Sequence, residues 1–512
     1  MNKKQNLYQM TSHKIAAILW AFFIMAVFVS CGTRRKVLPE PAKPVKREVR
    51  AAWLPTIFRT EYSSAGSEGT QKILEQRIRE LHRLGCNVII FQVRPESDAF
   101  YRSKHEPWSR FLTGMQGMAP NPEWDPLAFV VKLCHQLGME LHAWINPYRA
   151  ASNINVPLSS KHPYNVHPEW FVTYNNQLLY DPGVPDCRKH ICNVVRDIVM
   201  NYDIDAIHLD DYFYPYPAGG LPFPDDRSFA LYGNGYTQAT KGDWRRANVN
   251  RLMGEIKSTL LYTKPWVRLG ISPFGIYRNR RSWAKGSVTS GLQNYDDLYA
   301  DVLEWINRGW VDYIAPQIYW NKGTKAADYD VLTTWWGNLH LHNTQLYIGQ
   351  DVKRTMDGRQ LHHKLALSRR HSHGNVWWPG DELIRNYKGV ADSLATRYQH
   401  FKALPYAYSS LHNGRPKPVP SLHAEWVPEG YVLMWEDLRQ PNDPVEPFYY
   451  AVYAFPKGVK PDVENSRFLV QVSTAPYYVL PYKNGRLSYT YLVTAIDRFW
   501  NESKPAKINL KL

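Results

Sequence analysis

The feature that most constrains the fold is an alternation of apolar, strand-like runs with amphipathic, helix-like segments from residue 49 to residue 400. Two of the helical patterns end at a glycine, Gly85 and Gly138, as helices commonly do. Alternation of this kind predicts a parallel sheet in an α/β fold, and eight repeats over about 350 residues favour a (β/α)8 TIM barrel enlarged by loops. The expected strands are 49–56, 87–95, 140–147, 206–212, 268–275, 311–320, 345–352 and 374–380.

A doubly wound open sheet is the alternative α/β fold. It is disfavoured because no glycine-rich phosphate loop opens the first strand–helix unit. We therefore expect a barrel domain over residues 49–412.

The pattern changes after about residue 415, where strand-like runs follow one another without helices between them. Turns rich in Pro, Gly and Asn separate these runs, which predicts a small all-β sandwich over residues 418–512. The segment 491–503, Tyr-Leu-Val-Thr-Ala-Ile-Asp followed by Asn-Glu-Ser, resembles the end of a fibronectin type III domain. Residues 416–420, which are rich in proline, are the expected hinge between the two domains.

The N-terminus has the pattern of an export signal. Lys3, Lys4 and Lys14 precede an apolar run over 15–29, and Ser30 comes directly before Cys31. The segment resembles a bacterial lipoprotein signal peptide over residues 1–30, which implies lipidation of Cys31. A transmembrane anchor is the weaker alternative, because the run is shorter than the roughly 20 apolar residues that a span requires. Residues 31–48 are basic and proline-rich and predict a tether, and no acid follows Cys31 closely, which favours the periplasmic face of an outer membrane.

The charge of the chain narrows the class of partner. Loss of residues 1–30 removes three lysines and no acids, so the formal net charge falls from +16 to +13. A basic exported protein attracts an anionic polymer or membrane surface, whereas no basic helix or zinc-finger spacing supports binding to nucleic acid. The remaining cysteines lack the spacing of a disulfide scaffold and are expected to be buried free thiols, although Cys187 and Cys192 are close enough in sequence to form a bridge.

The most informative strand ends in two adjacent acids, Asp210 and Asp211, followed by Tyr212, Tyr214 and Tyr216. An unpaired ionised carboxylate is too costly to keep deep in a core, so this strand should deliver its acids to a cleft, where tyrosine rings can hold sugar faces. The alternative is that the two acids only cap the next loop or helix.

If the tyrosine rings hold a sugar, the acids beside them could take part in hydrolysis of its glycosidic bond, a reaction that normally needs two carboxyl groups. We expect one of Asp210 and Asp211 to be catalytic and the other to support it, because neighbours in a strand point to opposite faces. The partner is expected after the second strand, at Asp98 or Glu96, ahead of Asp351 after the seventh.

Polar and aromatic residues at the other strand ends are candidates for substrate binding. Amide and guanidinium groups bond hydroxyl, acetamido or carboxylate groups, while aromatic rings stack on sugars. His208 is expected on the same strand face as Asp210, which it could orient. For each residue alone, packing in the barrel is the alternative. The candidates are Gln92, Arg94, His142, Asn146, Tyr148, Arg149, His208, Tyr212, Gln317, Tyr319 and Trp320.

A metal-dependent hydrolase is a different possibility, since His142 and His208 lie on neighbouring expected strands close to Asp210 and Asp211. It ranks below a glycosidase because the first strand carries no His-x-His and the chain has no His-Glu-x-x-His. We expect neither a metal nor another cofactor.

Several of these motifs together resemble the glycosyl-hydrolase-like-10 family over most of residues 47–400. They are the segments 47–54 (REVRAAWL), 91–95 (FQVRP), 143–149 (AWINPYR), 207–216 (IHLDDYFYPY), 270–275 (GISPFG) and 312–320 (DYIAPQIYW). The resemblance implies a TIM-barrel glycoside hydrolase, often exported as a lipoprotein, that acts on peptidoglycan glycan strands stripped of stem peptides. The lactyl carboxylates of such strands suit a basic protein. Glu96-Ser97 departs from the Gly-containing turn expected there. A cell-wall-binding lipoprotein without catalysis is the alternative function.

Overall fold

Eight parallel strands close into a barrel in the computed structural model, which describes residues 42–440 and 442–512. Around the barrel the order is β1, β11, β10, β9, β8, β7, β3, β2. The strands are β1 (Val49–Leu54), β2 (Val88–Arg94), β3 (Glu140–Ile145), β7 (Ala206–Leu209), β8 (Arg268–Ile271), β9 (Tyr313–Ile314), β10 (Gln345–Asp351) and β11 (Gly374–Trp378). Each lies within one of the eight predicted runs, so the predicted TIM barrel is confirmed.

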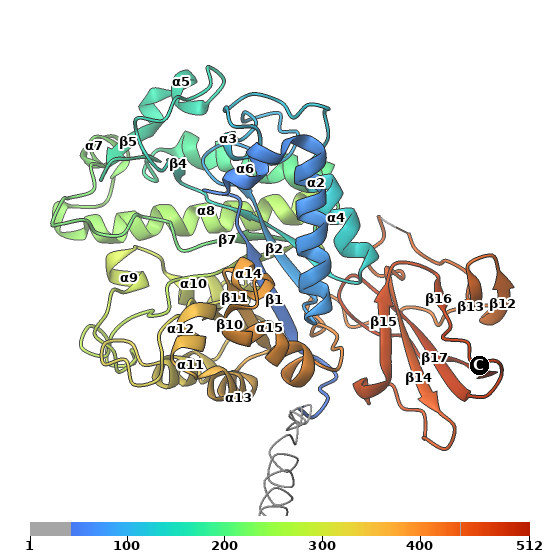
Figure 1. Ribbon diagram of the computed structural model, residues 1–512. Helices are drawn as coiled ribbons and strands as arrows, with labels where there is room; N and C mark the ends of the chain where they lie inside the picture. The colour runs from blue at the N-terminus through green and yellow to red at the C-terminus, as the bar shows by residue number, and fades with distance from the viewer. Residues whose placement is uncertain (1–41, 441) are drawn as a thin grey trace, which may run out of the picture. The chain divides into compact units, whose positions relative to one another are not determined.

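A helix follows each barrel strand, and together the helices pack around the barrel (Figure 1). They include α2 (Thr60–Arg83), α4 (Pro126–Gln136), α6 (Pro185–Asn201), α8 (Lys241–Thr263), α10 (Val302–Asn307), α11 (Tyr329–Gly337), α13 (Leu361–His371) and α14 (Gly380–Ile384). Local chemistry sets the ends of α4: the side chain of Asp125 accepts a hydrogen bond from the backbone N–H of Ala128, and Gly138 takes the left-handed conformation just beyond its last turn.

An additional three-stranded antiparallel sheet interrupts the connection between β3 and α6. It consists of β4 (Arg149–Ala151), β5 (Phe171–Tyr174) and β6 (Gln177–Tyr180), in the order β4-β6-β5. The strand–helix alternation did not predict it, because the sheet is an insertion within one repeat of the barrel. Its first strand begins at Arg149, four residues after Ile145, the last residue of β3.

The C-terminal part is all-β, as predicted. One sheet contains β12 (His423–Val427), β13 (Gly430–Met434) and β16 (Tyr477–Val479), and the other contains β15 (Leu469–Ser473), β14 (Tyr449–Pro456), β17 (Ser488–Ile496) and β18 (Ala506–Lys511) (Figure 1). Leu433 of the first sheet and Val452 and Val493 of the second share one buried cluster, so the sheets pack as a sandwich. The relation to fibronectin type III domains stays a prediction.

The sandwich contacts the end of the barrel at which the strands begin. The indole N–H of Trp500 donates a hydrogen bond to Glu140, the first residue of β3, and the hydroxyl of Tyr449 donates to the carbonyl of Met139 at 3.1 Å. Arg498 forms a 2.7 Å ion pair with Asp203. Because these contacts lie at the starts of the strands, the sandwich leaves the opposite, C-terminal rim of the barrel open for a site.

Residues 42–48, the end of the predicted tether, bind to both parts of the chain. The backbone N–H of Ala42 donates to the carbonyl of Arg397, and the ammonium group of Lys46 forms a 2.7 Å ion pair with Glu502. The predicted signal peptide and Cys31 lie outside the described residues. None of the helices described in the structure has the length and apolar character needed to cross a membrane. Cys86, Cys134, Cys187 and Cys192 are buried and free, which confirms that prediction.

Candidate active site

A cavity of about 460 Å³ opens at the C-terminal ends of the barrel strands, and Asp210 and Asp211 both line it. The two residues directly follow β7, and their relative exposures are only 4 % and 2 %. Six of the predicted binding residues share the cavity with them, and their side chains come from the ends of four barrel strands, β2, β3, β7 and β9. These six residues are Gln92, Arg149, Tyr212, Gln317, Tyr319 and Trp320.

Aromatic rings form most of the remaining surface of the cavity. On one side Tyr212 contacts Tyr216, Tyr216 contacts Phe274 and Phe274 contacts Trp320, with centroid separations of 5.5, 5.9 and 5.3 Å. A second group centres on Trp53, whose ring lies 6.5 Å from those of both Tyr319 and Trp378. Broad apolar faces beside buried acids suit the binding of sugar rings.

A chain of amide groups determines how Asp210 is held. The backbone N–H groups of Thr56 and Ile57 both donate to Oε1 of Gln92 at 2.9 Å, so the amide nitrogen of Gln92 must face the other way. That nitrogen donates to Oδ1 of Asn146 at 2.7 Å, which leaves the Asn146 nitrogen to donate to Oδ2 of Asp210. Asn146 is therefore a buried support of Asp210 rather than part of the cavity surface.

The hydrogen bonds around Asp210 also locate its proton. Oδ2 accepts from Asn146 and, at 3.3 Å, from the indole N–H of Trp144, whereas Oδ1 is approached by the backbone N–H of Tyr212 alone, at 3.3 Å. Because both lone pairs of Oδ2 are engaged, a proton on this carboxyl group belongs on Oδ1.

The two acids share a buried, electrostatically coupled environment. Burial raises the pKa of Asp210 to about 7; the positive charge of Arg149 opposes this rise, and the neighbouring Asp211 adds to it. Burial also raises the pKa of Asp211, although hydrogen bonds from Tyr216 and Gln317 favour its ionised form. Two like charges this close disfavour ionisation of both members at once, so the arrangement favours one protonated and one ionised carboxyl group at the same place.

The predicted partners after β2 do not line the cavity. Glu96 is 1 % exposed and its carboxylate is bound by Arg110 at 2.9 Å and by the backbone N–H of Ser152 at 2.7 Å. Asp98 is fully buried and accepts a 3.2 Å hydrogen bond from Gln116, and burial together with the charge of Glu96 raises its pKa to about 7. Both carboxyl groups therefore bind residues of neighbouring loops instead of lining the cavity. Asp351 instead caps α12 (Val352–Asp357) through the backbone N–H of Arg354.

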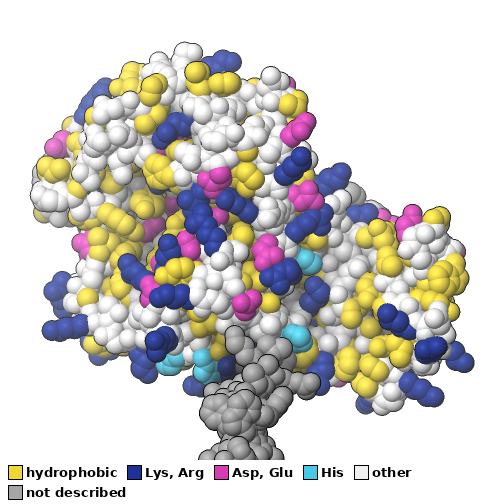
Figure 2. All heavy atoms as spheres, in the orientation of Figure 1, with side chains coloured by type: hydrophobic (Ala, Val, Ile, Leu, Met, Phe, Trp, Pro, Cys, Tyr) yellow, Lys and Arg dark blue, Asp and Glu magenta, His cyan; other side chains and the backbone are white. Residues whose placement is uncertain are grey.

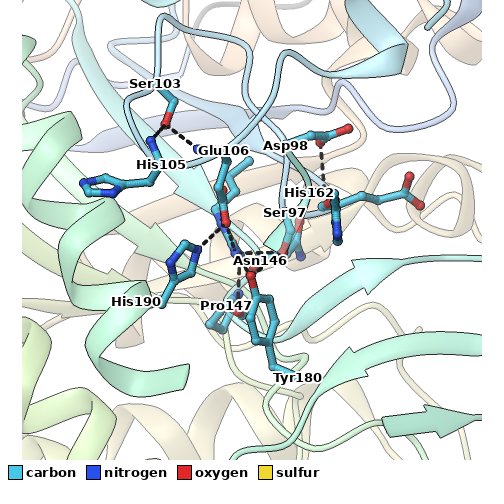
Figure 3. Close-up of polar contacts among 12 residues, drawn as sticks. Ser97, Asp98, Ser103, His105, Glu106, Asn146, Pro147, His162, Tyr180 and His190 are labelled. Carbon is cyan, nitrogen blue, oxygen red and sulfur yellow. Dashed lines mark hydrogen bonds and ion pairs between the residues drawn. The ribbon is translucent and has the colours of Figure 1, made fainter. Parts of the chain in front are cut away.

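Arg94 belongs to a buried ion-pair network instead of the substrate surface. Its guanidinium group forms a 2.6 Å ion pair with Glu106, and both side chains are completely buried. Glu106 also bonds His190 at 3.0 Å, and Tyr180 lies beside them with its hydroxyl 2.9 Å from that of Ser97 (Figure 3). Arg94 further donates to the carbonyl of Asn146, so the network supports the backbone of the residue that orients Asp210.

His142 and His208 lie inside the barrel below the cavity, joined through Tyr313. The Tyr313 hydroxyl is 2.7 Å from Nδ1 of His142 and 2.8 Å from Nδ1 of His208. Nε2 of His142 bonds Glu140 at 2.9 Å, and Nε2 of His208 lies 2.9 Å from the hydroxyl of Ser272. These positions correct the expectation that the two histidines touch substrate. Ser272, above them, does line the cavity.

Gly270 makes this interior connection possible. A Cβ atom at Gly270 would lie 1.9 Å from Cζ of Tyr313, so a larger residue in β8 would prevent the Tyr313 ring from crossing the barrel. Within residues 42–440 and 442–512, no three His, Cys, Asp or Glu side chains are grouped so that they could hold a metal ion.

Two tyrosines from the sequence analysis lie in the core. Tyr148 is 2 % exposed and Tyr214 is 1 % exposed, and Tyr214 packs against Phe223 and Tyr299. The residues predicted to bind substrate do not include several others that line the cavity. For most of these residues, a position at a strand end could have indicated the site. That position alone does not separate them from aromatic residues that pack between barrel and helices. These residues are Trp53, Ile57, Phe58, Trp144, Tyr216, Ser272, Phe274, Arg354 and Trp378.

Comparison with known proteins agrees with this architecture. Residues 48–364 match the family described as glycosyl hydrolase-like 10, a range that includes β1 to β10 and both acids. The chain belongs to the glycosyl hydrolase-like 10 family. It is 37 % identical over 487 residues to "Glycosyl hydrolase YngK" of Bacillus subtilis (strain 168), covering 91 % of this chain and 94 % of that protein. It is 36 % identical over 332 residues to "Glycosyl hydrolase DigH" of Escherichia coli (strain K12), covering 61 % of this chain and 74 % of that protein.

Similarity to solved structures is weaker. The catalytic domain of β-amylase from Paenibacillus polymyxa aligns with a TM-score of 0.45 at 12 % identity, covering 69 % of this chain and 98 % of that one. The fold of this member of the glycosyl hydrolase-like 10 family is therefore assigned from its own closed strand order. Membership of the family supports a glycosidase type of function with a polysaccharide substrate.

Proposed function

We propose that this protein hydrolyses glycosidic bonds in peptidoglycan glycan strands. The observation that carries the proposal is the buried pair Asp210 and Asp211 in a cavity walled by aromatic rings, where burial raises the pKa of both carboxyl groups. One member of the pair protonates the leaving oxygen and the other acts as a carboxylate.

The positive charges of the cavity support an anionic glycan. The guanidinium group of Arg149 lies 5.2 Å from the ring centre of Tyr212, beside the acids. Arg354 also lines the cavity and is exposed, and no described residue accepts a hydrogen bond from its guanidinium group. Lys and Arg side chains are also spread over the face of the molecule drawn in Figure 2. An unpaired arginine at the rim suits the lactyl carboxylate that each muramic acid exposes once its stem peptide is removed.

The test is digestion of purified glycan strands, with and without stem peptides, by the protein and by its Asp210→Asn and Asp211→Asn variants. Mass spectrometry of released saccharides should show cleavage of bare strands by the parent protein and a loss of about 10²-fold or more in at least one variant. Binding to strands without cleavage by the parent would overturn the proposal and favour a glycan-binding lipoprotein.

The Arg354→Ala variant tests whether Arg354 binds the lactyl carboxylate of the substrate. We expect this variant to raise KM for bare peptidoglycan strands by about 10-fold with little change in kcat, because a pairing made equally in ground and transition states affects binding. Chitin oligosaccharides, which lack the lactyl group, serve as the matched control and should show no difference between the two proteins. Equal losses on both substrates would contradict the role in recognising the carboxylate.

We further propose that the protein is a lipoprotein anchored through Cys31 on the periplasmic face of the outer membrane. The support is the sequence of residues 1–48, in which an apolar run, a small residue and a cysteine precede a basic tether. Incorporation of labelled palmitate into the parent protein, but not into a Cys31→Ser variant, would be the expected result. Fractionation with the inner membrane would contradict the location.

A further inference from the structure

Both carboxyl groups found in the lining of the cavity come from one stretch of backbone, directly after β7. Among the described residues that line it, Asp210 and Asp211 are the carboxylates, and they are consecutive in the chain. Their Cα atoms are therefore about 3.8 Å apart on one stretch of backbone. The two-carboxylate mechanisms of glycosidases place an acid and a nucleophile, or an acid and a base, so that they flank the scissile bond.

The opposite side of the cavity supplies aromatic rings. In the closed strand order, β7 lies across the barrel from β11, with β1 next to β11. The ends of these strands contribute Trp378 and Trp53 to the cavity. The neighbouring strand β10 ends at Asp351, but its carboxylate caps α12 at 2.7 Å from the backbone nitrogen of Arg354 and does not line the cavity.

The acids that follow β2 and β11 bind other residues: after β11, Asp381 forms a 2.7 Å ion pair with Arg59 and Glu382 a 3.1 Å ion pair with Lys353. Glu96 is paired with Arg110, and Asp98 is buried against Gln116, so neither reaches a sugar bound between the aromatic walls. The described residues that line the cavity thus place two carboxyl groups on one side of it and no further carboxylate facing them.

We infer that the nucleophile is part of the substrate: the carbonyl oxygen of a 2-acetamido group on the sugar whose bond is cleaved. This inference rests on the proposed glycosidase function, and it restricts the substrate class to glycans with a 2-acetamido sugar on the non-reducing side of the scissile bond. Peptidoglycan strands satisfy this requirement, because both of their alternating sugars carry the group.

The reaction balances with the groups present. The acetamido oxygen forms a bond to C1 as the glycosidic C1–O bond breaks, and the leaving oxygen takes the proton held by the aspartate pair. The ionised member of the pair accepts a hydrogen bond from the acetamido N–H and stabilises the positive charge of the cyclic oxazolinium intermediate. Water then attacks C1 from the opposite face, returns its proton to the acid, and the acetamido group re-forms. Two displacements at C1 retain the anomeric configuration.

The surroundings of the pair suit this division of roles. The Asp210 carboxyl is held by Asn146 and Trp144, and the Asp211 carboxyl by the hydroxyl of Tyr216, so each group has a fixed direction before substrate binds. Such fixed positions let the pair meet two atoms of one sugar, the glycosidic oxygen and the amide nitrogen, from the same side.

The test compares strands that carry N-acetyl groups with strands chemically converted to N-trifluoroacetyl groups, using the purified protein. Fluorine withdraws electrons from the carbonyl oxygen, so we expect kcat to fall by about 10²-fold or more while binding measured by calorimetry changes little. Nuclear magnetic resonance of the first product formed should show retained configuration at C1. A thiazoline analogue of the cyclic intermediate should inhibit at least about 10²-fold more tightly than the product binds.

The outcomes separate this inference from the proposed function. Hydrolysis with inverted configuration, equal rates for the two acyl groups or insensitivity to the thiazoline would overturn the inference and leave a glycosidase. Absence of hydrolysis on every strand would overturn both. The Asp210→Asn and Asp211→Asn variants then assign the two roles. The variant that lacks the acid should regain activity on aryl glycosides with acidic leaving groups, because these need no protonation. The variant that lacks the amide-binding carboxylate should stay inactive on them.

Discussion

The indole N–H of Trp53 donates a 3.1 Å hydrogen bond to Nε2 of His208, inside the barrel and below the cavity that Asp210 and Asp211 line. Because an indole nitrogen can only donate, Nε2 of His208 is an acceptor and Nδ1 carries the proton. Nδ1 therefore donates to the Tyr313 hydroxyl, which in turn donates to His142, and His142 donates to Glu140. The hydroxyl of Ser272 also lies 2.9 Å from Nε2 of His208, and the carbonyl of Leu209 is a second acceptor within its reach at 3.5 Å.

This chain of hydrogen bonds predicts a neutral His208 in a single tautomer. Burial and the neighbouring His142 lower the pKa of His208 well below its ordinary value of 6.5. We expect nitrogen chemical shifts of the Nδ1–H form that stay constant between about pH 5 and pH 8, where exposed histidines titrate. Nuclear magnetic resonance with labelled histidine measures this directly. A titrating His208, or the Nε2–H form, would show that the hydrogen bonds run in another direction.

The shared proton of Asp210 and Asp211 predicts an alkaline limb in the activity profile. With the pKa of Asp210 at about 7, kcat/KM should fall as the pH rises above that value, because the pair loses the proton that the leaving oxygen needs. Asn146→Ala removes a donor that favours the ionised form of Asp210. The limb should therefore move to higher pH while the maximal rate falls. Asn234→Ala, at an exposed position, should leave the profile unchanged, and an unmoved limb in the Asn146 variant would contradict the support assigned to it.

The raised pKa of Asp210 also predicts a cost in stability. Between the ordinary pKa of 3.8 and the folded value of about 7, the folded protein holds a proton that the unfolded chain has released, so this group lowers the free energy of unfolding as the pH rises across that window. Asp210→Asn removes the effect. The variant should match the parent near pH 4 and exceed it near pH 8, by up to about 1.4 kcal/mol for each unit of pKa shift.

Urea unfolding at the two pH values measures the difference. Asp186→Asn, at an exposed carboxylate, is the matched control and should stay within about 0.5 kcal/mol of the parent at both. A less stable Asp210→Asn variant near pH 8 would show that burial of this acid does not destabilise the fold.

The contacts of Trp500 predict that this residue stabilises the attachment of the sandwich to the barrel. Its indole N–H bonds Glu140, a carboxylate that is fully buried with Arg268 at 2.6 Å, and its ring stacks on Tyr449 at 5.0 Å. Trp500→Phe keeps the stacking and leaves one oxygen of Glu140 short of a donor, so the free energy of unfolding should fall by about 1–3 kcal/mol. Trp426→Phe, at a residue that is 62 % exposed, should change it by less than about 0.5 kcal/mol. Equal effects would mean that the buried hydrogen bond contributes little.

The barrel could be predicted because its signal is local and repeated. Apolar runs such as 87–95 and 140–147 are buried on both faces and alternate with helices that end two residues before Gly85 and Gly138, so each unit carries its own evidence. The end of β7 was also recognisable, since Asp210 and Asp211 follow a buried strand directly. The sheet formed by β4, β5 and β6 carried no such periodic signal.

The roles of the polar residues depended on packing that the sequence does not encode locally. Gln92, Arg94 and Asn146 all stand at strand ends, yet one lines the cavity, one pairs with Glu106 and one holds Asp210. A strand end specifies which rim a side chain reaches, but its direction there depends on neighbours far away in the chain, such as Thr56 for Gln92.

The sequence by itself determined the barrel, the all-β C-terminal part and the adjacent acids at the rim, because strand and helix periodicity and the residues that end each element are local properties. Only the tertiary structure decided that Asp210 and Asp211 share one cavity, that Glu96 and Asp98 lie outside it, and that His142 and His208 lie beneath it. The physical reason is that closing eight strands into a barrel brings residues from distant repeats to within hydrogen-bonding distance. Their burial and their pKa values arise from that closure.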